Sequence, residues 1–187
     1  MSQPWTHSAP GIGSYERVNE HYVEPYWVTE RLFDVEKFEG AIYDPCCGFG
    51  RILDVAAQHK HYAYGSDISD RGGGAVKDFL KDDLLHINIV CNPPFDIVQT
   101  FTQHALKLAQ KKVAIIFPTA RLNAARWLQE TPLRRVWLLT PRPSMPPGHV
   151  ILSGGKVGGG KSDYCWLVFE KGFSTDPVIK WLHRDES

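Results

Sequence analysis

Short apolar segments alternate with helix-like segments along most of this 187-residue chain, and this alternation constrains the fold more than any other feature. Strands that alternate with helices favour a parallel sheet with right-handed crossovers. The expected strands are residues 41–46, 61–67, 87–92, 113–117, 135–139 and 164–169, with a short strand or turn near 76–80, and the expected helices are 29–38, 50–58, 97–110 and 122–129. Because no helix-length pattern separates the last two strands, an antiparallel edge is expected. The predicted fold class is therefore α/β, a doubly wound, mostly parallel sheet in a single domain.

The apolar run at residues 86–91, which reads as a buried strand, is followed by Asn92, Pro93, Pro94 and Phe95. The two prolines fix two φ angles and remove two N–H donors, and the residue before each proline is kept out of the helical region. The predicted result is a stiff hook that presents an amide side chain, carbonyl oxygens and an aromatic ring. This set suits a planar amine, because acceptors can bind its hydrogens and a ring can stack on it. A plain strand followed by a proline turn is the alternative.

A glycine turn follows an earlier strand signal, at residues 44–50, and a helix-like segment comes directly after it. A strand, a glycine turn and a helix form the layout of a nucleotide-type cofactor site in an open α/β sheet. Gly48 and Gly50 allow a tight turn and a close ligand, and Asp44 can accept hydrogen bonds from a cationic or donor-rich group. The spacing does not match the G-x-G-x-x-G dinucleotide fingerprint.

Two further acidic residues follow at suitable positions. Asp67 ends the next expected strand, about 20 residues after the glycine turn, where an acid binds ribose hydroxyls. Asp78 stands beside Phe79, and this pair could contact the edge and the face of an adenine. A solvent-exposed carboxylate without a ligand is the equal alternative for Asp78.

Together these motifs resemble the S-adenosylmethionine-dependent amino methyltransferases, above all small phage-type and bacterial N6-adenine DNA methyltransferases. The resemblance covers roughly residues 20–120 and rests on Asp-Pro-x-Cys-Gly-x-Gly at 44–50, Ser-Asp-Ile at 66–68, Asp-Phe-Leu at 78–80 and Asn-Pro-Pro-Phe at 92–95. It implies the Rossmann-like class I methyltransferase fold and S-adenosylmethionine as the cofactor. The order and spacing of the motifs carry the resemblance, since no single motif is decisive.

The resemblance implies a role for each motif in cofactor binding. The first acid and its glycines would hold the methionine part, the second acid the ribose, and the third acid the adenine amino group. Residues 26–29 loosely match an N-terminal segment that closes over the methionine end, although Thr29 is also a sensible helix N-cap. The residues implied to bind the cofactor are Asp44, Pro45, Cys46, Gly48, Gly50, Asp67, Ile68, Asp78, Phe79, Tyr26 and Thr29.

The same resemblance implies the catalytic residues. Asn92 and the Pro93 carbonyl would hold the target amine, Pro94 would stiffen the hook, and Phe95 would stack on the target ring. No metal is needed, because the sulfonium already carries an activated methyl group, and catalysis would rest on positioning and electrostatics. The same hook also serves rRNA guanine and protein glutamine methyltransferases. These remain alternatives, as does a cofactor-binding interaction module without turnover.

Charge is balanced overall, but residues 119–162 carry seven Lys and Arg side chains against one acid. A basic region beside a base pocket is what phosphate contacts require, which favours a nucleic-acid partner, with DNA expected first. A solvated mixed surface is the alternative. Residues 141–162 are expected to form a flexible basic substrate-side loop, and their Gly-Gly-Gly-Lys-Ser string lacks P-loop spacing. The candidate substrate-binding residues are Arg121, Arg142, Lys156 and Lys161.

The predicted division of the chain is an irregular N-terminal arm at residues 1–25 and a methyltransferase domain at 26–187. Neither a secretory signal nor an apolar run near the roughly 20 residues of a membrane span is seen, so we expect a cytoplasmic protein that makes no membrane contact. The four cysteines show no metal spacing and are expected to be reduced thiols. The core leaves little chain for target recognition, so a homodimer or an accessory specificity partner is expected.

Overall fold

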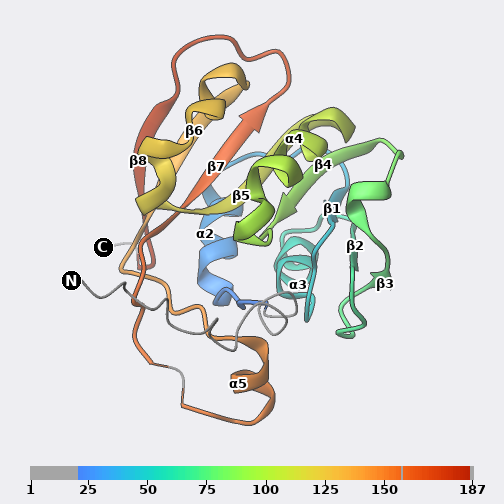
Figure 1. Ribbon diagram of the computed structural model, residues 1–187, viewed down its shortest axis with the longest axis vertical. Helices are drawn as coiled ribbons and strands as arrows, with labels where there is room; N and C mark the ends of the chain where they lie inside the picture. The colour runs from blue at the N-terminus through green and yellow to red at the C-terminus, as the bar shows by residue number, and fades with distance from the viewer. Residues whose placement is uncertain (1–20, 157, 186–187) are drawn as a thin grey trace, which may run out of the picture.

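The computed structural model describes residues 21–156 and 158–185, and within them the strands form a single eight-stranded sheet (Figure 1). The order across the sheet is β3-β2-β1-β4-β5-β7-β6-β8. The strands are β1 (Ile42–Asp44), β2 (Ala63–Asp67), β3 (Ala75–Val76), β4 (His86–Cys91), β5 (Ala109–Pro118), β6 (Leu133–Thr140), β7 (Tyr164–Glu170) and β8 (Val178–His183). The α-helices are α2 (Tyr26–Val35), α3 (Arg51–Gln58), α4 (Val98–Leu108) and α5 (Gly148–Leu152), and the 3-10 helices are η1 (Phe79–Lys81), η2 (Phe95–Ile97), η3 (Thr119–Ala124) and η4 (Arg126–Glu130).

The predicted mixed sheet is confirmed. Neighbouring strands from β3 through β2, β1 and β4 to β5 are all parallel. Strand β7 is antiparallel to both β5 and β6, and β8 pairs parallel to β6. The antiparallel pairing thus lies on one side of the sheet. Strands β6 and β8 extend the sheet beyond β7 on that side.

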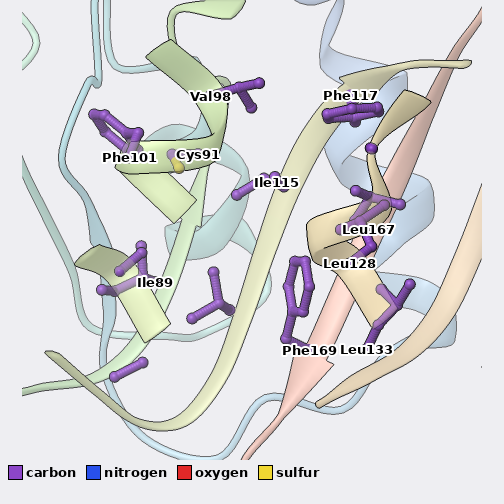
Figure 2. Close-up of a cluster of buried hydrophobic side chains, with 14 of the residues drawn as sticks. Ile89, Cys91, Val98, Phe101, Ile115, Phe117, Leu128, Leu133, Leu167 and Phe169 are labelled. Atoms are coloured by element: carbon purple, nitrogen blue, oxygen red, sulfur yellow. The ribbon is translucent and has the colours of Figure 1, made fainter. Parts of the chain in front are cut away.

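Helices cover both faces of the sheet, as a doubly wound fold requires. One apolar cluster joins α2 and α3 to the sheet, and the other joins α4, η1 and η4 to the opposite face. Figure 2 shows part of the second cluster, in which Phe101 of α4 and Leu128 of η4 lie among side chains of the strands. Successive residues of β7 alternate between the clusters, since Trp166 belongs to one and Leu167 to the other. This alternation follows from the two-residue period of a strand buried on both faces.

Three expectations about secondary structure were wrong or incomplete. The helix expected at residues 122–129 is replaced by η3 and η4, because Ala125 between them has a ψ of 58°, outside the helical range. Strand β8 was not expected, since its burial pattern is mostly exposed and gives no buried apolar run. The loop expected at 141–162 contains the short helix α5.

Helix α2 also differs from expectation at its start. Thr29 is not the N-cap, because the helix begins three residues earlier, at Tyr26, and Pro25 is its cap. Proline is tolerated at the start of a helix, because a backbone N–H there would have no partner within the helix and proline has none to leave unpaired. Of the arm expected at residues 1–25, residues 1–20 lie outside the described part of the chain. Among the described residues, no helix is long and apolar enough to cross a membrane.

The topology brings several chain segments to one edge of the sheet. The carboxyl ends of β1, β2 and β4 meet there because these strands are parallel. Strand β6 also ends at this edge, and the antiparallel β7 begins at it, so residues 141–163 connect the two strands at the same edge. Helix α5 lies in this connection, apart from the other helices (Figure 1). Ligands of open α/β sheets bind at such carboxyl edges.

Candidate active site at the carboxyl edge of the sheet

Asp44 ends β1 and is 1% exposed. Its Oδ1 accepts a hydrogen bond from the backbone N–H of Cys46 at 3.0 Å. Burial raises the pKa of Asp44 well above its usual range, and the nearby charges of Glu24 and Asp67 add to this effect. The end of β1 therefore carries a desolvated carboxyl group that a cationic ligand would stabilise in its charged form.

The glycine turn joins the ends of β1 and β2. The N–H of Gly48 donates to Asp67 Oδ2 at 3.0 Å, and Gly50 has a φ of 84°, the left-handed conformation from which α3 starts. The other oxygen of Asp67 accepts from the N–H of Ser69 at 3.0 Å and from Arg71 Nε at 3.3 Å. Asp67 thus holds the turn and the loop after β2 together.

The loop after β2 packs directly on the glycine turn. Gly73 donates its N–H to the Gly48 carbonyl at 3.1 Å. A Cβ on Gly73 would lie 2.4 Å from that carbonyl oxygen and 2.5 Å from Gly50 N. A Cβ on Gly74 would lie 2.4 Å from the carbonyl oxygen of Gly65. Backbone lies against backbone here, so this loop requires glycine at both positions.

The hook after β4 lies at the same edge as Asp44. The Cys46 thiol donates to the Asn92 carbonyl at 3.3 Å, which joins the segments that follow β1 and β4. The Asn92 side chain donates its amide hydrogens to the Tyr22 carbonyl at 2.8 Å and to Glu24 Oε2 at 2.9 Å. Since Nδ2 is fixed by two acceptors, Oδ1 points away from them as the acceptor for another group.

An aromatic pair stands beside this amide. The Phe95 ring lies 5.7 Å from the ring of Tyr164, with an angle of 32° between the planes. Both side chains are half-buried, whereas Pro93 is buried and Pro94 is exposed. Arg121 donates to the Phe95 carbonyl at 2.6 Å and so ties η3 to the hook.

Two segments far apart in the sequence, residues 21–24 and 146–148, run together over the glycine turn. The N–H of Val23 donates to the Pro146 carbonyl and that of Gly148 to the His21 carbonyl, both at 2.9 Å. A Cβ on Gly48 would lie 3.1 Å from the His21 ring, and this ring contacts Phe49 edge-on with 4.7 Å between centroids. Desolvation by burial lowers the pKa of His21 and so favours the neutral form of its imidazole.

The remaining candidate cofactor residues differ in exposure and in surroundings. Ile68 is 66% exposed, and Pro45 is buried. Asp78 caps η1 through the Leu80 N–H at 3.1 Å, and the Phe79 ring is buried in the apolar core.

The N-terminal candidates, Tyr26 and Thr29, lie on α2. The Tyr26 hydroxyl donates to Asp54 Oδ2 at 3.1 Å, and its ring faces the Arg51 guanidinium at 5.0 Å. Thr29 is 1% exposed, and its buried Oγ1 has no hydrogen-bond partner among the described residues. A buried hydroxyl without a partner is uncommon and is a group that a ligand or water could satisfy.

The basic region divides between the two edges of the sheet. Arg142 donates to Asp163 Oδ1 at 2.6 Å near the start of β7, and Lys156 and Lys161 are exposed in the same connection. Arg134 and Arg135 instead lie at the opposite edge, where they help line a cavity of about 460 Å³. The expectation that the whole basic region adjoins the hook is therefore wrong for these two arginines, because they begin β6 and the site lies where β6 ends.

The cysteines of the site are protected thiols. Burial raises the pKa of Cys46 well above its usual range and that of Cys47 to about 12. Thiols that stay protonated are poor nucleophiles and poor metal ligands. Within residues 21–156 and 158–185, no cluster of three His, Cys, Asp or Glu side chains could hold a metal ion.

Sequence reasoning missed the residues that reach the hook from elsewhere in the chain. Glu24 and the Tyr22 carbonyl precede α2, and Tyr164 starts β7, so no local motif links them to Asn92. One signal was present for Gly73, because the run of glycines at residues 72–74 is unusual between a strand and the next element. Such a run of glycines indicates a place where two backbone segments pack closely, and it could have pointed to this contact.

No protein-family model and no curated protein matches this sequence significantly. Solved structures do match. The chain is similar to magnesium protoporphyrin IX methyltransferase from Synechocystis PCC 6803 with bound SAM, with 15% identity, a TM-score of 0.55 and coverage of 78% of this chain and 76% of that one. It is also similar to a putative RNA methyltransferase from Pyrococcus horikoshii, with 14% identity, a TM-score of 0.57 and coverage of 78% and 81%.

A third similar structure is the M protein of the type I restriction enzyme EcoKI, at 14% identity and a TM-score of 0.53. The match covers 84% of this chain but 47% of that protein, so this chain corresponds to about half of it. At these identities the likeness shows the fold. The chain has the class I methyltransferase fold, a mixed α/β sheet with antiparallel pairing on one side.

Proposed function

We propose that this protein transfers a methyl group from S-adenosylmethionine to a planar amine of a nucleic acid, with adenine N6 in DNA as the first candidate. The observation that carries this proposal is the meeting of two features at one edge of the sheet. The acid and glycine turn after β1 adjoins the amide and ring hook after β4, through the contact between the Cys46 thiol and the Asn92 carbonyl.

The residues at the turn fit a cofactor that carries positive charge. Asp44 and Asp67 are 1% and 7% exposed, and desolvation raises the pKa of Asp44. A sulfonium or an ammonium group bound here would offset that desolvation. Asp67 uses three of its roughly four acceptor positions within the protein, which leaves capacity for a ribose hydroxyl.

The residues of the hook fit the amine that accepts the methyl group. Bound S-adenosylmethionine would supply a methyl group activated by the sulfonium sulfur. Asn92 Oδ1 would accept a hydrogen of the amine, which counters delocalisation of the nitrogen lone pair into the ring. Phe95 and Tyr164 would hold the plane of the base by stacking. Rate acceleration would come from this positioning and from fixed dipoles, and a base in a duplex would first have to be flipped out.

Arg121, Arg142, Lys156 and Lys161 belong to the same proposal as phosphate contacts. Arg121 and Arg142 are held near the hook and near the start of β7 through the Phe95 carbonyl and Asp163. The two lysines are exposed in the connection between β6 and β7, where they can reach a backbone phosphate. We further propose that a second copy of the chain or an accessory protein supplies target recognition. The protein would act in the cytoplasm.

The substrate is tested by transfer of labelled methyl groups from S-adenosylmethionine to DNA, RNA and protein pools. We expect label in DNA, recovered as N6-methyladenine after digestion to nucleosides. Label in rRNA guanine or protein glutamine would replace the adenine proposal but keep the methyl-transfer one. If the cofactor binds and no pool is labelled, the protein is a binding module and the proposed activity is wrong.

Cofactor binding is tested at Gly73, outside the hook. We expect Gly73→Ala to weaken S-adenosylhomocysteine binding by about tenfold or more, because the new methyl would push the loop off the glycine turn. Isothermal titration calorimetry measures this affinity. The matched control is Gly159→Ala, where nothing lies within 4 Å of the added Cβ. Equal affinities of the two variants would contradict a cofactor site at this turn.

A further inference from the structure

Glu24 is buried beside the hook, although it belongs to the segment before α2. It is 7% exposed, and its carboxylate accepts a hydrogen bond from Asn92 Nδ2 at 2.9 Å. The Tyr22 carbonyl accepts from the same nitrogen at 2.8 Å. Two acceptors, one from a side chain and one from the backbone, therefore bind the amide nitrogen.

The segment that carries both acceptors is fixed on two sides. The Glu24 carbonyl accepts from Arg51 of α3 at 2.9 Å, and Val23 pairs with Pro146. Tyr22 forms an antiparallel bridge with Pro147. The acceptors are thus held by α3 and by the β6–β7 connection, independently of β4 and the hook.

The two orientations of the Asn92 amide differ chemically. In the observed one, the NH2 group meets two acceptors, so Oδ1 is the group turned away from them. In the flipped one, Oδ1 would face two other oxygens, and the NH2 group would be presented to the target amine. Donor would then meet donor on one side and acceptor would meet acceptor on the other, so the flipped orientation is disfavoured at both ends.

We propose that Glu24, together with the Tyr22 carbonyl, is the positioning residue that fixes the Asn92 amide with its oxygen available to the substrate amine. This inference rests on the proposed function for its catalytic consequence. Its structural part, the fixed orientation of the amide, stands on the two hydrogen bonds alone. Glu24 does not touch the substrate in this scheme and acts through Asn92.

The structural part is tested by NMR on the ligand-free protein, without any measurement of activity. The Asn92 side-chain amide gives its own pair of ¹H–¹⁵N signals. We expect Glu24→Ala to shift both signals and to speed their exchange with solvent, and Glu24→Gln to change them less because the glutamine oxygen can still accept. The control is Asp34→Ala, the loss of an exposed carboxylate on α2, which should leave the Asn92 signals unchanged. Unchanged Asn92 signals in Glu24→Ala would overturn the inference.

The catalytic part is tested by a double-mutant cycle with a substrate from the labelling assay. We expect Glu24→Ala to lower kcat by about 10- to 100-fold, the size expected for a misplaced catalytic group, and Glu24→Gln to restore most of it. In an Asn92→Ala background, Glu24→Ala should cause no further loss, because both residues act through one amide. Additive losses, or equal losses for Ala and Gln, would show that Glu24 acts otherwise and overturn the proposal. If no pool is labelled, the proposed function fails while the NMR result still decides the amide contact.

Discussion

Replacing Asn92 with alanine is expected to lower kcat for methyl transfer by about 10²- to 10³-fold, the loss typical of removing one fixed dipole at a reacting centre. The affinity for S-adenosylhomocysteine should stay within about twofold, because the carboxylates and glycines of the cofactor turn are untouched. In the proposed mechanism Asn92 contributes its amide oxygen, because the Tyr22 carbonyl and Glu24 already bind its amide nitrogen. Single-turnover kinetics with labelled cofactor, beside calorimetry, measures both quantities.

Asn88 provides the control for loss of folding. It lies on β4, the strand that precedes the hook, and its amide donates to the carbonyls of Glu39 and Ala41 at 3.0 and 3.1 Å, away from the carboxyl edge. We expect Asn88→Ala to lower the thermal midpoint but to leave kcat per folded molecule within about twofold, since its contacts are structural. Undiminished kcat in Asn92→Ala would refute the role given to the hook.

Replacing Glu36 with alanine is expected to destabilise the protein by about 3 to 5 kcal/mol, the cost of breaking a buried ion pair on one side. Glu36 is 2% exposed and accepts hydrogen bonds from Arg135 at 2.7 Å, Lys112 at 2.9 Å and Trp137 Nε1 at 3.0 Å. It therefore joins the end of α2 to β5 and β6, and its loss leaves two cations poorly paired. Urea unfolding followed by circular dichroism measures the change.

Glu39 serves as the control at the same edge. Its side chain is 61% exposed and pairs with Lys111 at 2.9 Å, so Glu39→Ala should change the free energy of unfolding little, as is usual for an exposed ion pair. Similar free energies of unfolding for the two variants would contradict the organising role of Glu36.

The pH dependence of stability should also trace to Glu36. Although desolvation raises its pKa, hydrogen bonds from Arg135, Lys112 and Trp137 outweigh this and hold it below the usual glutamate value. A carboxyl whose pKa is lower in the folded state stabilises the protein above its unfolded pKa, and this stabilisation is lost as the pH falls through the folded value. The difference in free energy of unfolding between wild type and Glu36→Gln should therefore shrink on acidification.

Much of the fold could be predicted because local patterns specify it. The run Val113–Phe117 and the run Cys165–Phe169 are apolar at every position, as strands buried on both faces must be. Strand β8 could not be predicted in this way, because Ile179 and Trp181 are exposed and the pairing with β6 depends on the rest of the sheet. The break at Ala125 is likewise a product of tertiary packing, since alanine itself favours a helix.

Only those parts of the candidate site that form a local sequence motif, a strand end with the turn after it, could be predicted. Asp44, Gly48 and Asp67 lie on consecutive elements with a fixed spacing, and the hook is marked by two prolines. The partners of Asn92 come from 68 and 70 positions away along the chain, and Tyr164 reaches Phe95 from β7. Contacts of this kind depend on topology, which residue spacing does not encode. The roles in cofactor and substrate binding remain predictions.

The reversed direction of β7 has an evolutionary consequence. Because the chain leaves β6 and re-enters the sheet through β7 at one edge, the intervening stretch can be lengthened, shortened or exchanged without altering any strand register. The entropic cost of a longer excursion grows only slowly with its length. Relatives can therefore vary residues 149–162 while the strand registers, and the contacts of residues 146–148 with residues 21–24, are inherited unchanged.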